Sequence, residues 1–230
     1  MSLFVIKMIA ISSMFFDHLG VFLFPGDIYF RLVGRLSFPL FAWAIANGAH
    51  FTKNINKYLI RILILAFVSQ IPYLLLFKTY GVDKPGLNIL FTLALGLFGI
   101  ILLNKFNNFL VRALIVSLLA LFAILISVDY GAFGVLTIIV FYLYYEKPVK
   151  FSIFCTLLVT LFYLLPIVVN RYFGSIFNVS NVNILEIYSP LSLPIIAAYN
   201  KKLGYNLKYL FYIFYPLHLL LIYSIAVYLF

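Results

Sequence analysis

The chain has 230 residues, of which 66% are hydrophobic and only 10% are charged. A soluble domain carries about 25% charged residues, so this chain has too few polar groups to cover a water-facing surface. In a soluble protein, its net charge of +10 would suggest a nucleic-acid partner. Here the cations lie mostly in short connections between apolar runs, so membrane topology explains the charge better. We therefore expect a lipid bilayer as the partner, and no nucleic acid.

Apolar runs of about 20 residues follow one another along nearly the whole length, as expected for helices that cross a bilayer. Turn-forming stretches such as Pro25-Gly26-Asp27 separate them. We predict an all-α, polytopic transmembrane helix bundle that forms one integral-membrane domain, 1–230. The predicted spans are 3–24, 28–50, 57–78, 87–104, 108–128, 131–146, 149–169, 183–199 and 207–229. The break near Asp129 is the weakest, so eight or ten spans remain open.

The cations indicate how these spans are oriented. The connections after the even-numbered spans hold most of them: Lys53, Lys57, Lys105, Lys147, Lys150, Lys201 and Lys202. The connections after the odd-numbered spans hold fewer cations, and acidic residues dilute those. Because cytoplasmic loops carry an excess of Lys and Arg, we predict a cytoplasmic N-terminus.

Ionisable side chains within the predicted spans are candidates for function, because each costs about 2.5–3.5 kcal/mol at the centre of a membrane helix. With a rise of about 1.5 Å per residue, Asp17 and His18 lie about 21 Å above the cytoplasmic start of the first span. Arg31 and Arg35 share one face of the second span and lie about 5 and 10 Å below its outer end. Three more polar residues fall in the outer half or near the midplane: Gln70, Asn88 and His218. We predict one polar cluster in the outer half of the membrane.

These residue types suit proton abstraction beside a stabilised negative charge. His18 or His218 can remove a proton from an amine or a hydroxyl, and Asp17 can orient the imidazole of His18. Arg35 and Arg31 can bind an oxyanion or an anionic group.

Each of these residues also has a structural interpretation. Arg31 could extend to the outer headgroups, and Asp17 could simply form a buried ion pair with Arg35. Gln70 and Asn88 could hold helices together by hydrogen bonds, and His18 and His218 could be buried histidines bonded to backbone carbonyl oxygens. Two histidines and an aspartate could ligate zinc, but the chain has no C-x-x-C or H-E-x-x-H spacing, so we expect no metal.

Several blocks of sequence carry a resemblance to one known family. They are Phe16-Asp17-His18, Gly34-Arg35-Leu36-Ser37-Phe38-Pro39-Leu40-Phe41, Ser69-Gln70-Ile71-Pro72, Asn88-Ile89-Leu90-Phe91 and Phe214-Tyr215-Pro216-Leu217-His218. With these blocks the chain resembles the TraX family, named for the conjugative-plasmid protein that N-acetylates pilin. The resemblance implies an acetyltransferase of the bacterial cytoplasmic membrane that uses acetyl-CoA. It is similar in logic to the membrane acyltransferases that modify cell-surface sugars.

The expected roles combine the chemistry of the residues with this resemblance. Catalytic roles are expected for Asp17, His18, Arg35 and His218. Binding of the acceptor is expected for Arg31, Gln70, Asn88 and Tyr215. Binding of the CoA phosphates near the cytoplasmic face is expected for Lys53, Lys57 and Arg61. The acceptor amine or hydroxyl, on a pilin-like N-terminus or a surface glycan, would arrive from outside.

Two other classes of function remain open. A proton-coupled transporter could use the same buried Asp, His and Arg side chains, although the sequence shows no internal repeat of the kind many transporters have. A structural assembly factor would need the cluster only for helix packing. In that case Arg35→Gln would lower stability without removing a specific activity.

Overall fold

The computed structural model describes residues 1–173, 176 and 183–229. Within these residues it contains helices and no β-strand, apart from one isolated bridge between Leu87 and Val128. The elements are α1 (Leu3–Phe22), α2 (Ile28–Gly34), α3 (Ser37–Phe51), α4 (Ile55–Thr79), α5 (Ile89–Leu103), α6 (Phe109–Leu125), α7 (Gly131–Leu143), α8 (Pro148–Val159), the π-helical segment η1 (Thr160–Leu164), α9 (Leu165–Phe173), the 3-10 helix η2 (Ile184–Ser192), α10 (Leu193–Ala197) and α11 (Lys208–Leu229). The predicted all-α bundle is therefore confirmed.

Each predicted span coincides with one helix or with consecutive helices, but these segments differ in length. Five are long and apolar enough to cross a membrane: Leu3–Phe22, Ile28–Phe51, Ile55–Thr79, Pro148–Phe173 and Tyr209–Tyr228. Four are shorter apolar helices: Ile89–Leu103, Phe109–Leu125, Gly131–Leu143 and Ile184–Ala197. Multiple apolar helices of crossing length make this a multi-pass membrane protein. The number of spans and the cytoplasmic N-terminus remain predictions.

Polar residues between the apolar runs determine where helices begin. Asn54, Asn88 and Asn108 each precede a helix, and each side chain accepts a hydrogen bond from a backbone N–H of the first turn. A proline determines the break within the second predicted span. Pro39 has no N–H to donate to the carbonyl of Arg35 four residues earlier, and α2 ends at Gly34 while α3 begins at Ser37. Arg35 consequently lies at the joint between two helices.

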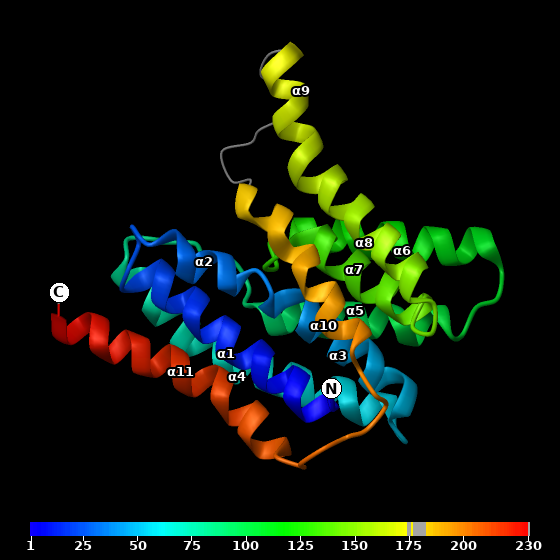
Figure 1. Ribbon diagram of the computed structural model, residues 1–230, viewed down its shortest axis with the longest axis horizontal. Coiled ribbons are helices and arrows are strands. Elements are labelled where there is room, and N and C mark those ends of the chain that lie inside the picture. Colours follow the sequence, from blue (N-terminus) through cyan, green and yellow to red (C-terminus); the bar gives the residue numbers. More distant parts are fainter. Residues whose placement is uncertain (174–175, 177–182, 230) are drawn as a thin grey trace.

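The helices pack in two groups that meet through α3 and through the packing of α4 on α5. Figure 1 shows α2, α1 and α11 side by side, with α4 passing behind them, and α1 contacts α2, α3 and α11. The second group consists of α5, α6 and α7, and α3 packs on α7. The continuous segment from α8 to α9 rises beyond the other helices at the top of the view, and η2 runs beside it. This arrangement places η2 against both α2 and α3.

The connections between helices gather at two ends of the bundle. At one end, Leu3 N and Phe4 N donate to the carbonyl oxygens of Lys202 and Leu203 over 2.9 and 3.0 Å. At the same end, Lys201 Nζ lies 3.4 Å from Glu146 Oε1. The connections after the sixth and eighth predicted spans therefore lie together with the N-terminal residues.

Candidate functional site

A buried network of two arginines and two carboxylates joins α1, the α2–α3 joint and η2. Arg31 Nη1 lies 2.9 Å from Asp17 Oδ1, and Arg35 Nη2 donates to the same oxygen. Arg35 Nη1 donates to Glu186 Oε1. Arg35 is 3% exposed and Glu186 is 2% exposed, so both charges are removed from solvent and depend on each other. The formal charges of the four side chains cancel.

The two arginines differ in how many of their donors are used. Arg35 donates through Nη1 and Nη2 to the two carboxylates, and through Nε to the Arg31 carbonyl oxygen at 3.2 Å. Arg31 makes one described side-chain hydrogen bond, to Asp17, and its side chain is 23% exposed. Arg35 is thus the centre of the network, whereas Arg31 is the arginine that a ligand can reach.

Gly34 allows α2 to approach α1 closely enough for this network to form. A Cβ atom at Gly34 would lie 2.6 Å from Asp17 Cγ and closer still to Asp17 Cβ and Oδ1. Contacts this short force atoms to move. The glycine that precedes Arg35 in the sequence block is therefore required by the packing of Asp17.

Gly34→Ala is expected to lower the free energy of unfolding by about 1–3 kcal/mol, because the added methyl group displaces the Asp17 carboxylate from both arginines. Gly26→Ala is the matched control, since a Cβ at Gly26 would meet nothing within 4 Å. Both variants can be unfolded thermally in detergent micelles beside the wild type. Equal transition temperatures for the two variants would contradict this account of Gly34.

Sequence patterns alone missed Glu186. The signal was present, because Glu186 is the one charged residue in the predicted span 183–199. Its carboxylate oxygen Oε2 is buried and has no hydrogen-bond partner among the described residues. The Tyr130 side chain lies within electrostatic range of Glu186, Arg35 and Asp17.

Tyr130 is a second neighbour of the network that the sequence did not indicate. Its backbone is left-handed, with φ of 60°, a conformation that costs roughly 1 kcal/mol or more in a residue other than glycine. Two contacts hold it there. Its ring stacks on Phe38 with 4.1 Å between the centroids, and its N–H donates to Asp129 Oδ1 over 3.0 Å. The turn before α7 thus presents a tyrosine to the charged network.

A pair of histidines joins α1 to α11. His18 Nδ1 lies 2.7 Å from His218 Nε2, and the two rings stack with 5.0 Å between their centroids. His218 Nδ1 lies 2.8 Å from the Phe214 carbonyl oxygen, and Tyr215 packs its ring 5.4 Å from the His218 ring. Three expected site residues therefore meet here, and two of them, His18 and His218, are 200 positions apart in the chain.

The partner of His18 differs from the one expected. Asp17 was expected to orient the His18 imidazole, but its described hydrogen bonds go to Arg31 and Arg35. Consecutive residues of an α-helix point about 100° apart, so Asp17 faces α2 while His18 faces α11. The two groups nevertheless stay close, because His18 lies within electrostatic range of both guanidinium groups.

Gln70 and Asn88 form a separate contact between α4 and the start of α5. Asn88 Nδ2 donates to Gln70 Oε1 over 2.7 Å and to the Ala66 carbonyl oxygen over 2.9 Å. Gln70 Nε2 donates to the Gly86 carbonyl oxygen over 2.9 Å. Most of their hydrogen-bonding capacity is used within the protein, which favours the structural interpretation over acceptor binding.

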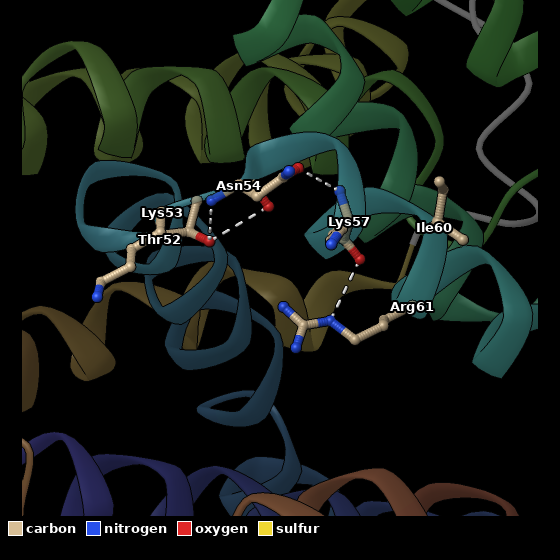
Figure 2. Close-up of a pocket in the computed structure, with 6 residues that line it drawn as sticks. All are labelled: Thr52, Lys53, Asn54, Lys57, Ile60 and Arg61. Atoms are coloured by element: carbon tan, nitrogen blue, oxygen red, sulfur yellow. Dashed lines mark hydrogen bonds between the residues drawn. The ribbon is translucent and has the colours of Figure 1, made fainter.

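The cations expected to bind CoA lie together at the start of α4. They border a hollow of about 410 Å³ lined by Thr52, Lys53, Asn54, Lys57, Ile60 and Arg61. Figure 2 shows Arg61 hydrogen-bonded to the Lys57 carbonyl oxygen, while the Lys53 side chain extends away from Arg61. Lys57 and Gln70 are 13 residues apart on α4, or about 20 Å along the helix. The basic hollow is thus well separated from the Gln70–Asn88 contact, and none of the Asp, Arg and His residues of the two site clusters lines it.

The fold and these groups define a helical integral-membrane protein with a buried Asp-Arg-Glu network beside a histidine pair. The family model described as TraX protein matches residues 2–226, and the chain belongs to the TraX family. It is 30% identical over 253 aligned positions to the "Probable fimbrial assembly protein FimC, serogroup H1" of Dichelobacter nodosus, covering 99% of this chain and 97% of that protein. No solved structure matches the chain. The resemblance noted from the sequence blocks is confirmed.

Proposed function

We propose that this protein is a membrane acyltransferase that moves an acetyl group from acetyl-CoA to an amine or hydroxyl of an acceptor. The supporting observation is that a histidine pair lies beside two arginines in a TraX-family chain. Histidine exchanges protons near neutral pH. A guanidinium group stabilises the negative charge that develops on a thioester carbonyl oxygen during acyl transfer.

The reaction balances as a direct transfer. The acceptor N–H or O–H gives its proton to a histidine as its lone pair attacks the acetyl carbonyl carbon. Arg31, the arginine with unused donors, stabilises the resulting oxyanion or anchors the acceptor, and Arg35 holds Asp17 and Glu186 in place. The C–S bond then breaks, and the CoA thiolate takes up the proton.

The acceptor that best fits the relatives is the terminal amine of a pilin-like protein. The family resemblance implies acetylation of pilin, and the Dichelobacter nodosus relative is named for fimbrial assembly. In this proposal acetyl-CoA enters at the end of the bundle that bears Lys53, Lys57 and Arg61, which is the cytoplasmic end if the positive-inside assignment holds. The acceptor approaches from the opposite side.

Transfer can be tested directly with purified full-length protein in proteoliposomes and acetyl-labelled CoA. Three acceptors are compared: a peptide with a free terminal amine, the same peptide with its amine blocked, and a glycan with free hydroxyls. We expect label on the free-amine peptide together with release of CoA thiol. Absence of both signals with all acceptors would refute the proposal. Solute flux driven by a proton gradient without acyl donor would indicate transport instead.

Binding of the donor at the basic hollow predicts a second result. Arg61→Ala is expected to raise the KM for acetyl-CoA about three- to fivefold, because a cation exposed to solvent contributes up to about 1 kcal/mol to an ionic contact. The kcat should stay unchanged, since this contact is equally strong before and during the reaction. Lys78→Ala, near the other end of α4, is the matched control. An unchanged KM in Arg61→Ala would place the donor elsewhere.

A further inference from the structure

The hydrogen bonds of the histidine pair determine which ring nitrogens carry protons. The Phe214 carbonyl oxygen can only accept, so His218 Nδ1, 2.8 Å away, must donate to it. A neutral imidazole has one N–H. His218 Nε2 therefore has a lone pair and accepts the 2.7 Å hydrogen bond from His18 Nδ1. The remaining nitrogen, His18 Nε2, is the one in the pair with a lone pair free for another partner.

The four ring nitrogens of the neutral His18–His218 pair can accept one further proton but not two. If both rings were imidazolium ions, all four nitrogens would be donors, and two N–H groups would face each other across 2.7 Å. With one added proton, the hydrogen bond reverses. His18 holds a proton on Nε2, and His218 holds one on each nitrogen and donates back to His18 Nδ1. The pair thus has two complete hydrogen-bonded states with a single heavy-atom arrangement.

The surroundings favour placing the added positive charge on His218. Burial disfavours a positive charge on either ring. Arg31 and Arg35 lie within electrostatic range of His18, so a charge on that ring is in addition repelled by two cations, whereas His218 has neither arginine among the groups that act on it. The His218 ring stacks on Phe214 with 4.9 Å between centroids and touches Tyr215, and an aromatic face attracts a cation. His218 is 3% exposed, whereas His18 is partly exposed. The free nitrogen therefore belongs to the ring that a substrate can reach.

We propose that His18 Nε2 takes the proton from the acceptor, and that His218 is a positioning residue that accepts the His18 Nδ1 proton in the same step. This inference rests on the proposed function. As the acceptor lone pair attacks the acetyl carbon, its proton passes to His18 Nε2 and the Nδ1 proton passes to His218 Nε2. Departure of the CoA thiolate reverses both transfers, and the thiolate leaves as the thiol.

The ring protons can be observed without any activity measurement. The chain has 3 histidines, so protein labelled with 15N only at histidine gives few signals in lipid or micelles, and single His→Gln variants assign them. We expect His18 and His218 both to carry their proton on Nδ1. A proton on His218 Nε2 in the resting protein would overturn the relay.

The relay can be separated from simple positioning by His218→Gln. The glutamine carbonyl can accept the His18 Nδ1–H and hold the ring, but it cannot take up a proton. In single-turnover reactions in mixtures of H2O and D2O, the wild-type rate should depend on the deuterium fraction along a curve, because two protons move together. The His218→Gln rate should depend on it linearly and be lower by up to about a hundredfold, the low end of the usual contribution of general acid–base catalysis, because His18 still accepts the proton.

Matched outcomes distinguish this inference from the proposed function. His50→Gln is the control, because His50 lies at the end of α3 that is farther from Arg35. This variant should retain the curved dependence on the deuterium fraction and the wild-type rate. A linear dependence in the wild type, or an unchanged rate in His218→Gln, would overturn the relay and leave acyl transfer standing. A wild-type protein that transfers no acetyl group while showing the expected ring protons would overturn the proposed function, and the catalytic role of the relay with it.

Discussion

Arg35→Gln is expected to lower the free energy of unfolding by about 3–5 kcal/mol, the effect of leaving a buried charge without its partner. The substitution removes the guanidinium group that holds both Asp17 and Glu186. The carboxylate of Glu186, which is 2% exposed, then has neither solvent nor a cation to compensate its charge. Unfolding by titration with a denaturing detergent measures the loss. Arg31→Gln is the matched control and should cost about 1 kcal/mol or less, because Arg31 is partly exposed.

A double variant shows whether the lost stability comes from the network itself. Glu186→Gln removes the stranded carboxylate, so Arg35→Gln combined with Glu186→Gln should be less destabilised than the sum of the two single variants. The coupling should fall within about 0.5–3 kcal/mol for residues in direct contact. Strict additivity would contradict the ion pair. Full transfer activity in folded Arg35→Gln would show that Arg35 stabilises the protein without a catalytic role of its own.

His18→Ala is expected to reduce the kcat for acetyl transfer about a hundredfold to ten-thousandfold, the usual contribution of a positioned general base. The KM for acetyl-CoA should change little, because the cations expected to bind the donor line a hollow that His18 does not border. Transfer of labelled acetyl groups under saturating donor measures the effect. The His218 variant tested above should lose less, since it leaves the proton-accepting nitrogen in place.

The control for His18→Ala is His50→Ala. His50 is exposed and lies near the C-terminal end of α3. Its Nε2 lies 3.1 Å from the Tyr142 carbonyl oxygen. It shares the chemistry of His18 but not its position. Equal activities in His18→Ala and the wild type would remove histidine from the proposed mechanism, while equal losses in both histidine variants would indicate a general loss of folding.

Much of the charged network could be predicted from spacing and depth. Arg31 and Arg35 are four residues apart, and helix geometry places them near the depth of Asp17. The neighbouring helix that each of the Asp17 and His18 side chains faces could not be predicted, because it depends on how α1 is rotated about its axis relative to α2 and α11. Glu186 was missed for a related reason. Its contact with Arg35 joins positions 151 residues apart, and local patterns carry no information on such pairs.

The lengths of the helices show a different limit. Hydropathy marks where apolar residues lie, but it does not show where backbone hydrogen bonding stops. The run 108–128 was predicted as one span, yet α6 ends at Leu125, because the chain takes up left-handed conformations at Ser127, Tyr130 and Gly131. The same turn brings Tyr130 to the network. Left-handed non-glycine residues leave little trace in sequence patterns.

The backbone pairing of Leu3 and Phe4 with Lys202 and Leu203, together with the His18–His218 contact, has a consequence for biogenesis. A ribosome produces α1 well before α11, so His18 enters the membrane long before its partner exists. Until α11 arrives, α1 also lacks the helix that covers its histidine face. Arrested nascent chains that end before α11 should therefore contain α1 in the membrane but no completed histidine pair. Maturation of the site therefore waits for the synthesis and insertion of α11.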